Sequence, residues 1–405
     1  MHYKRALLVT LLVGVLAVSA IAFQFYWQNL RGVAPASQPP PEDIARLINR
    51  GVQNATEFPL QLPDDLAISI FAEDVPGARV MAFDPNGVML VSLTGSGQVV
   101  ALPDNDHDGV ANEQVTVASG LQQPHGLAFH CGAGERCRLY IAEAGQVVVY
   151  DYDAQNLKAQ NGQKIIDLPV GGRHFTRTLL IHNDQLLISV GSSCNVCNEA
   201  DWRRSSVLVS SLDGSNLRTF SSGLRNAVFM AEQPSTGDVW ITEMGRDLLG
   251  DNLPPDEINV LRDGGNFGWP VCYGQNVHDT NFDKNVYIRD PCSDRIPARL
   301  DLQAHSAPLG LAFFHDDWPA PYRGSLLVAY HGSWNRSVPT GYKVVRYQPD
   351  QAAGKSNPQD FISGWLNDKN QALGRPVDIK ILPGGVMYIS DDKAGVIYRV
   401  EYTGE

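Results

Sequence analysis

The sequence lacks three patterns that would each point to a particular class of protein. It has no excess of basic residues, because 32 Lys and Arg stand against 44 Asp and Glu, a formal net charge of −12. Nucleic-acid phosphates require clusters of Lys and Arg, so no nucleic-acid partner is expected. Beyond residue 50 it has almost no long helical periodicity, which argues against a helical bundle. It also has no histidine after Cys194-Asn195-Val196-Cys197, where a covalent c-type haem would need one.

One long apolar run is present, at the N-terminus. Lys4 and Arg5 precede a stretch without charged residues from Ala6 to Leu30. About 20 apolar residues are enough to cross a bilayer as a helix, and the basic pair favours a cytoplasmic N-terminus. We therefore predict that residues 6–27 anchor the chain in the inner membrane and that the rest is periplasmic. A cleaved signal peptide ending near Ala20-Ile21-Ala22 is the alternative and gives the same compartment.

The six cysteines agree with an exported protein. Disulfides persist in oxidising compartments, and an even number of cysteines fits a disulfide framework. Along the chain they fall into three local pairs, although six cysteines allow 15 connectivities. For residues 194–197 a structural disulfide is favoured over a redox-active pair or a metal site. The pairs are Cys131/Cys137, Cys194/Cys197 and Cys272/Cys292.

Composition divides the chain into three parts. Residues 1–30 form the signal anchor or signal peptide, residues 31–64 a Pro-rich linker with a short helix at residues 42–49, and residues 65–405 the main domain. In the main domain, apolar and β-branched runs alternate with turns of Gly, Pro, Asn or Asp. The repeating unit is a strand, a polar turn, a second strand ending in a small or acidic residue, and a third strand. Its six copies begin at Val80, Gly126, Arg177, Ala227, Gly310 and Asp378.

This repeat predicts an all-β fold, a six-bladed β-propeller with four-stranded antiparallel blades that follows the N-terminal transmembrane or signal segment. A unit of roughly 55 residues suits a propeller blade with generous loops. Closing the ring also removes the exposed strand edges that an open array would leave. A β-sandwich is the alternative, and it is disfavoured because its strands need no repeat of this length.

Several polar motifs follow the strand-like runs, as expected where loops converge at one end of a propeller channel. Together they resemble the motifs of the glucose/sorbosone dehydrogenases, soluble sugar dehydrogenases that use pyrroloquinoline quinone (PQQ), and are most similar to the sorbosone dehydrogenase branch. The resemblance covers about residue 65 to the C-terminus, and that family's fold is a six-bladed propeller. The motifs are Gly171-Gly172-Arg173-His174, Gly223-Leu224-Arg225-Asn226, Asp256-Glu257-Ile258-Asn259, Gly264-Gly265-Asn266-Phe267-Gly268-Trp269-Pro270 and Gly374-Arg375-Pro376-Val377-Asp378.

The resemblance implies an oxidoreductase that oxidises an aldose, or a related polyol or aldehyde, by hydride transfer to PQQ. His174 matches the base that takes the hydroxyl proton, and Arg225 matches the cation that stabilises the reduced quinone. Structural roles are the alternatives: a loop hydrogen bond for His174 and an inter-blade salt bridge for Arg225. Electrons would pass to an external acceptor, because the chain has no haem motif. The implied cofactor-binding residues are Arg225, Asn226, Arg375, His331 and Arg336.

A calcium ion is also implied, held by the backbone carbonyls of Gly245 and Arg246. Carbonyl oxygens suit this hard cation, which would activate the quinone. Here the chain departs from the sugar-oxidising pattern. Arg246 stands where the family commonly has Pro, Met244 where it has a polar amide, and Arg173 where an acid often precedes the base. A cation beside a metal site is electrostatically unfavourable unless its side chain turns away.

A second calcium site is predicted in the loop after the first repeat. Asp104, Asp106 and Asp108 alternate and are followed by Gly109, as in the first half of an EF-hand loop. The twelfth position is Val115, where an EF-hand has its bidentate Glu. A solvated acidic turn is the alternative.

Two other functions are compatible with a six-bladed propeller. One is a calcium-dependent hydrolase of the lactonase type, in which Glu, Asn and Asp side chains hold a central ion. The other is a non-catalytic propeller that binds a partner or a glycan. The favoured hypothesis is the periplasmic quinoprotein dehydrogenase, with a sugar as substrate, an external electron acceptor and the inner membrane as partners.

Overall fold

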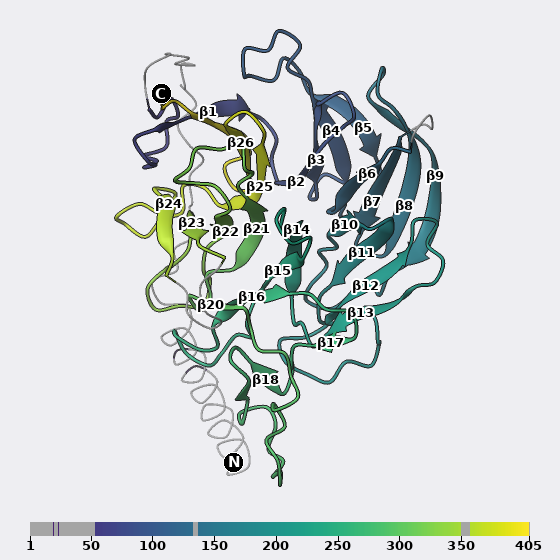
Figure 1. Cartoon of the computed structure of the whole chain (residues 1–405), viewed down its shortest axis with the longest axis vertical. Coiled ribbons are helices and arrows are strands. Elements are labelled where there is room, and N and C mark those ends of the chain that lie inside the picture. Colours follow the sequence, from purple (N-terminus) through teal and green to yellow (C-terminus); the bar gives the residue numbers. More distant parts are fainter. Residues whose placement is uncertain (1–18, 20–22, 24–52, 133–136, 350–356, 405) are drawn as a thin grey trace, which may run out of the picture.

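The computed structural model describes residues 53–132, 137–349 and 357–404, together with Ser19 and Phe23. Six antiparallel sheets follow one another around a centre, with β2–β9 on one side and β21–β26 on the other (Figure 1). No helix of the described residues is long and apolar enough to cross a membrane. The predicted anchor at residues 6–27, apart from Ser19 and Phe23, and the predicted helix at residues 42–49 lie outside the described residues.

The first three blades each contain four strands that are consecutive in sequence. Blade 1 is β2 (Ala78–Phe83), β3 (Met89–Leu93), β4 (Gln98–Leu102) and β5 (Val115–Ser119). Blade 2 is β6 (Leu127–His130), β7 (Arg138–Glu143), β8 (Gln146–Asp153) and β9 (Lys158–Asp167). Blade 3 is β10 (Leu179–His182), β11 (Gln185–Val190), β12 (Ser206–Ser211) and β13 (Arg218–Ser222).

The other three blades complete the ring. Blade 4 is β14 (Ala227–Glu232), β15 (Val239–Glu243), β16 (Asp256–Val260) and β20 (Leu300–Leu302). Between its last two strands lie β17 (Gly265–Asn266), which pairs with β13, and the hairpin β18 (Cys272–Tyr273) and β19 (Val277–His278). Blade 5 is β21 (Pro308–Phe313), β22 (Leu326–Tyr330), β23 (Lys343–Tyr347) and β24 (Gln359–Ile362). Blade 6 is β25 (Pro376–Leu382), β26 (Val386–Asp391), β27 (Val396–Tyr402) and β1 (Leu66–Ala72).

Blade 6 joins the two ends of the described propeller. β1 pairs antiparallel with β27, with Ile68 opposite Val400. The first strands of neighbouring blades also contact one another around the ring, in the order β2, β6, β10, β14, β21, β25 and back to β2. A closed ring leaves no blade without a neighbour on either side.

The predicted six-bladed propeller is confirmed, and the β-sandwich alternative is wrong. Each of the six sequence repeats corresponds to the first three strands of one blade. The second strand of a blade is covered on both faces, so β3, β15 and β22 are buried at every position and read as apolar runs. The fourth strand has no such run, because it lies at the rim. β9, for example, is exposed at most of its positions.

The blade topology decides which loops meet. Because successive strands are antiparallel, a first strand begins at the end of the ring where the second strand finishes, as with Ala227 opposite Glu243 and Pro376 opposite Asp391. We call this end the N face, since the first strands begin there. It carries the loops before each first strand and those between second and third strands. The opposite end, the C face, carries the remaining loops.

Closure of the ring by β1 predicts that truncating a core residue of this strand lowers the free energy of unfolding. Ile68 is 1% exposed and packs in the core shared by β1, β26 and β27. Truncation of such a side chain leaves a cavity, so Ile68→Ala is expected to lower the free energy of unfolding by about 2–5 kcal/mol. Val286, which is 99% exposed, is the control, and Val286→Ala should change it by less than about 0.5 kcal/mol. Urea unfolding measures the free energy of unfolding of both variants. Equal losses in Ile68→Ala and Val286→Ala would contradict closure of the ring by a buried β1.

Candidate active site

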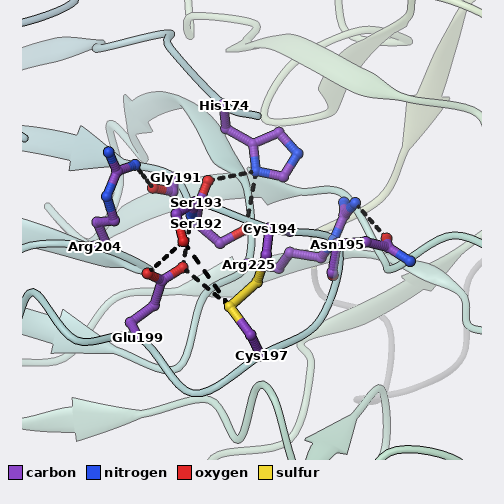
Figure 2. The surroundings of a disulfide bond; sticks show 10 residues. All are labelled: His174, Gly191, Ser192, Ser193, Cys194, Asn195, Cys197, Glu199, Arg204 and Arg225. Atoms are coloured by element: carbon purple, nitrogen blue, oxygen red, sulfur yellow. Dashed lines mark hydrogen bonds between the residues drawn. A yellow bond between two sulfur atoms is a disulfide. The ribbon is translucent and has the colours of Figure 1, made fainter. Parts of the chain in front are cut away.

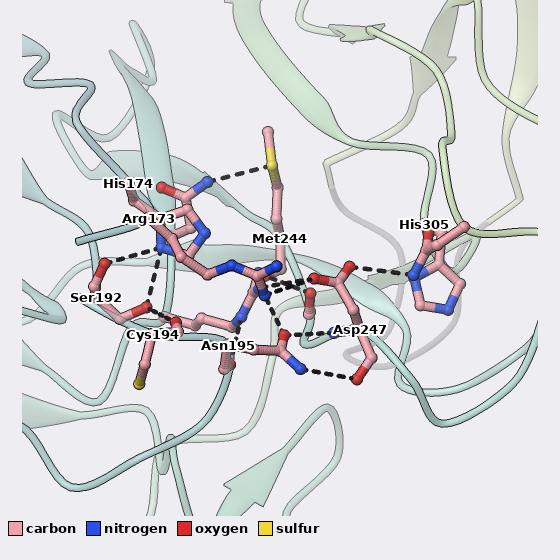
Figure 3. Close-up of polar contacts among 12 residues, drawn as sticks. Arg173, His174, Ser192, Cys194, Asn195, Met244, Asp247 and His305 are labelled. Atoms are coloured by element: carbon pink, nitrogen blue, oxygen red, sulfur yellow. Dashed lines mark hydrogen bonds and ion pairs between the residues drawn. The ribbon is translucent and has the colours of Figure 1, made fainter. Parts of the chain in front are cut away.

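The N face of blades 3 and 4 gathers most of the predicted catalytic residues. His174 lies in the loop before β10, and residues 192–197 follow β11. Arg225 and Asn226 directly precede β14, and residues 244–247 follow β15. Four loops that are distant in sequence therefore meet at one end of the ring, and Figure 3 shows their side chains in contact.

The hydrogen bonds of His174 determine which ring nitrogen carries the proton. Nδ1 lies 3.0 Å from the carbonyl oxygen of Ser192 and 2.9 Å from its Oγ (Figure 2). The Ser192 hydroxyl donates its own hydrogen to the carbonyl oxygen of Cys194 at 2.6 Å. Both contacts therefore need a proton on Nδ1, so Nε2 of the neutral ring is unprotonated, and among the described residues it has no hydrogen-bond partner.

The surroundings of His174 favour this neutral form. Burial, together with the positive charges of Arg225, Arg173 and Arg177, lowers the pKa of His174 to about 3. Gly191 lies against the ring, and a Cβ there would come within 2.7 Å of the His174 Cβ. The imidazole is thus held in one place with an unprotonated Nε2, which is the arrangement of a proton acceptor.

Arg225 is held rigidly by protein groups. It is 4% exposed, and its five N–H donors all have acceptors. Nε donates to the carbonyl oxygen of Asn195, Nη1 to those of Met244 and Gly245, and Nη2 to Asn195 Oδ1 and Asp247 Oδ2. Asp247 balances the charge at 3.1 Å. Arg225 therefore acts as a fixed, partly compensated positive charge.

Asn226 offers an acceptor without a partner. Its Nδ2 lies 3.3 Å from Met244 Sδ, but its buried Oδ1 has no hydrogen-bond partner among the described residues. Glu243, the last residue of β15, contacts the same segment: its Oε1 accepts the backbone N–H groups of Arg225 at 2.6 Å and Asn226 at 3.1 Å. Burial raises the pKa of Glu243 well above its usual range. A buried acceptor of this kind normally has a donor or a cation as its partner.

The predicted metal-binding residues Gly245 and Arg246 follow β15 and lie next to Arg225. The Gly245 carbonyl accepts Arg225 Nη1 at 2.9 Å. The Arg246 side chain forms a buried ion pair with Asp279, with Nε and Nη2 at 2.5 and 2.9 Å from its oxygens. Asp256 accepts the N–H of Gly245 at 2.9 Å, and burial raises its pKa to about 7. The positive charge of Arg246, an objection to a metal here, is thus compensated by Asp279.

The remaining predicted cofactor ligands lie on the N face of blades 5 and 6. His331 Nε2 lies 2.9 Å from Asp392, which also pairs with Arg79 at 2.7 Å. Arg375 donates to the hydroxyl of Tyr342 at 3.2 Å and lies over its ring. Arg336 differs from these, because its Nη1 is bonded to two backbone carbonyls, those of Asp251 and Ala304. The predicted residues therefore share one face but form two groups.

Four residues of the site were not identified from the sequence as functional. Ser192 orients His174, Asn195 and Asp247 hold Arg225, and Asn335 donates to Asp247 at 3.1 Å. The sequence does contain an indication of a functional role for Asp247, since this residue follows a strand within the polar segment that contains Glu243. Ser192 and Asn195 carry none, because their partners come from other loops.

The predicted acidic calcium loop lies away from this site. It joins β4 to β5 and so belongs to the C face. Carboxylate oxygens of Asp104, Asp106 and Asp108 lie within 4.8 Å of one another, and Asp104 accepts the N–H groups of Asp108 and Gly109 at 3.2 and 3.1 Å. Calcium binding here remains a prediction, and its role would be structural.

Calcium titration tests this loop. For a Kd of about 10⁻⁴–10⁻³ M, about 10 mM calcium should raise the free energy of unfolding by roughly 1.4–2.7 kcal/mol. The variant Asp104→Asn/Asp106→Asn/Asp108→Asn should lose that increase, as measured by thermal unfolding with and without calcium. An equal increase in the variant would locate the ion elsewhere.

The buried neutral His174 predicts a pH dependence of stability. Its folded pKa of about 3 lies below the unfolded value of about 6.5, so between these values the unfolded chain binds more protons. The stability present above about pH 6.5 is therefore lost as the pH falls toward about 3. Urea unfolding at several pH values should give a steeper loss for the wild type than for His174→Gln. Parallel curves would mean that the imidazole is solvated.

Comparison of the sequence with known proteins gives relatives over nearly the whole propeller. A family model described as TrAA12-like matches residues 60–403. An uncharacterized protein of Borreliella burgdorferi is 29% identical over 85% of this chain and 91% of its own length. A pyrroloquinoline quinone-dependent sugar dehydrogenase of Hypocrea jecorina is 24% identical, covering 87% of this chain and 93% of the relative.

Solved structures give the same fold. The holo form of the pyranose dehydrogenase PQQ domain from Coprinopsis cinerea superposes with a TM-score of 0.74 at 22% identity, over 85% of this chain and 98% of the domain. A calcium structure of the Trichoderma reesei carbohydrate-active enzyme family AA12 gives a TM-score of 0.73 at 22% identity, over 87% and 99%. At this identity the likeness supports the propeller itself.

Proposed function

The chain belongs to the TrAA12-like family, and on that premise we propose that it is a PQQ-dependent sugar dehydrogenase. A relative that aligns with 87% of this chain carries that name, in agreement with the family resemblance of the sequence motifs. The single observation that carries the proposal is His174, a neutral imidazole with a free Nε2. It lies on the N face of the propeller, where the charge of the buried cation Arg225 acts on it.

The residues of the N face fit the proposed cofactor. PQQ carries three carboxylates, and this face presents the guanidinium groups of Arg173 and Arg375, both of them partly exposed. Asn226 Oδ1 and the carbonyls of Gly245 and Arg246 would be the oxygen donors for a hard cation such as calcium, with the Gly245 carbonyl shared with Arg225 Nη1. When bound, the quinone would accept the hydride that leaves the sugar carbon, with calcium polarising its carbonyl.

His174 would take the hydroxyl proton of the sugar on Nε2. Its Nδ1–H remains bonded to the Ser192 carbonyl, which stabilises the positive charge that the ring gains. A pKa of about 3 is low for a base at neutral pH. Because Arg225 and Arg173 contribute to this low value, an anion bound beside them would raise it. Cofactor binding would in this way activate the base.

Arg225 would contribute through its charge. All of its N–H groups are bonded to protein acceptors, so it does not need to rearrange when negative charge develops on a neighbouring oxygen. Direct binding of cofactor carboxylates would fall to cations with free donors. Arg375 meets this requirement better than Arg336, whose Nη1 is occupied by carbonyls.

We further propose that the protein works outside the cytoplasm, in the periplasm, held at the inner membrane by residues 6–27, and passes electrons to an external acceptor. Its six cysteines support this location, because all of them form disulfides: Cys131–Cys137, Cys194–Cys197 and Cys272–Cys292. Disulfides are maintained in oxidising compartments. Cell fractionation, with and without residues 1–30, tests the anchor.

Calorimetric titration with PQQ in the presence of calcium tests the dehydrogenase. The wild type and His174→Ala are both expected to bind the cofactor. Loss of a general base typically costs about 10²–10⁴-fold in rate, so sugar-dependent dye reduction should fall by that factor in His174→Ala. The matched control is His182→Ala, since His182 ends β10 on the C face, and it should retain activity.

Each outcome has a separate meaning. Failure of the wild type to bind PQQ would refute the proposed function. Binding and turnover by the wild type, with full activity in His174→Ala, would leave the function intact and refute the base.

A further inference from the structure

The loop closed by the Cys194–Cys197 disulfide contacts Arg225 through Asn195, and Ser192, which precedes the loop and is bonded to Cys194, contacts His174 (Figure 2). We propose that this loop, with Ser192 before it, is the positioning element of the site, in which Ser192 orients His174 and Asn195 holds Arg225. The roles of these residues in turnover rest on the proposed function. The contacts of Ser192 and Asn195 are observed in the structure and do not depend on the proposed function.

Ser192 connects the base to the loop. Its carbonyl oxygen and Oγ both accept from His174 Nδ1, and its hydroxyl donates to the Cys194 carbonyl at 2.6 Å. Its own N–H donates to the carbonyl oxygen of Arg225 at 2.7 Å. Ser192 is fully buried, so it has no water with which to exchange these bonds. A shift of Cys194 would therefore be transmitted to the imidazole.

Asn195 forms the contacts with the cation and its counter-ion. Its carbonyl oxygen accepts Arg225 Nε at 2.8 Å, and its Oδ1 accepts Arg225 Nη2 and the Asp247 N–H, both at 2.9 Å. Its Nδ2 donates to the Asp247 carbonyl at 3.1 Å. One side chain thus holds the guanidinium and the backbone of its counter-ion together: Figure 2 shows Asn195 beside Arg225, and Figure 3 shows Asn195 bonded to Asp247. Two of the five donors of Arg225 depend on this residue.

The disulfide explains how a short loop can hold His174 and Arg225 in fixed positions. Residues 194–197 form no strand or helix, so without a cross-link their backbone would keep its freedom. The bond joins cysteines three positions apart and holds the Cys194 and Asn195 carbonyls in fixed directions. Glu199 anchors the adjoining chain by accepting the N–H of Ser193 at 2.6 Å and its hydroxyl at 2.8 Å. Reactive groups of an enzyme need such fixed geometry, since displacements of about 1 Å can cost about 10²-fold in rate.

Because of the charges around His174, its pKa should respond to any opening of the 194–197 loop. The charged groups that face it are Arg225, Arg173 and Arg177, and all three disfavour protonation, as burial does. Opening the loop would admit water, so the pKa of His174 would move up toward its ordinary value.

The test compares two double variants in the full chain. Cys194→Ser/Cys197→Ser opens the proposed loop, and Cys131→Ser/Cys137→Ser is the matched control. The control pair also closes a short loop, but it lies between β6 and β7 on the C face. With PQQ and calcium, the first variant is expected to lose about 10²-fold in kcat and its acid limb of kcat/KM should move to higher pH. The control should change neither.

Two single variants separate the two contacts. Ser192→Ala should alter the histidine, and Asn195→Ala should alter the arginine. NMR of the apo-protein with isotope-labelled histidine and arginine reads each group directly. In the wild type at neutral pH, His174 should show an Nδ1–H whose signal is shifted by its bond to Ser192 Oγ, and Arg225 a slowly exchanging Nη2 hydrogen, which is bonded to Asn195 Oδ1. Ser192→Ala should change only the first signal, Asn195→Ala only the second, and the Cys194/Cys197 variant both.

The outcomes are distinguishable from failure of the proposed function. If the wild type neither binds PQQ nor oxidises sugar, the function is refuted, while the NMR pattern still decides the positioning role. If the Cys194/Cys197 variant keeps the wild-type signals of both residues and its kcat, the proposal is overturned. Equal, non-selective changes in both single variants would likewise overturn it, because a merely structural loop would give that result.

Discussion

The pairing of β1 with β27 is the interaction on which the other features of this protein depend. It joins the two ends of the propeller in one blade and completes the ring. Once the ring is closed, antiparallel pairing within each blade places the loops before the first strands and those after the second strands on the same face. Residues as distant in sequence as His174, Arg225 and Arg375 share the N face for this reason alone.

Three cations on that face are paired with carboxylates, and these pairs define much of the chemistry available. Arg225 is paired with Asp247, Arg246 with Asp279, and Arg79 with Asp392. Removing charges from water is costly, so these guanidinium groups take carboxylates, whereas the buried Arg177 is stabilised by the backbone carbonyls of Pro169, His174 and Thr176. His174 has no carboxylate partner among the described residues: the charged groups that face it are Arg225, Arg173 and Arg177, and it stays neutral. An electropositive site with one neutral, oriented base suits an anionic cofactor and a substrate that loses a proton.

The departures of the sequence from the sugar-oxidising pattern have structural answers. Arg246 turns to Asp279, so its charge does not stay unpaired beside the proposed ion site. Met244 contacts the amide of Asn226 through its sulfur, and its carbonyl accepts Arg225. Arg173 lies half exposed near Asp247 and contributes to the low pKa of His174. None of these substitutions removes the oriented imidazole or the fixed guanidinium.

The number of blades and most of the residues that meet at the N face could be predicted from the sequence. The repeated apolar strands are legible because the inner strands of a blade are buried on both faces, whereas the rim strand β9 is too exposed to leave such a pattern. The motifs around His174 and Arg225 were recognisable because they are continuous segments. The folded arrangement of the loops was needed to show which nitrogen of His174 is unprotonated and that Ser192, Asn195 and Asp247 hold the site. Those contacts join side chains from separate loops, and no pattern along one chain encodes a hydrogen bond between them.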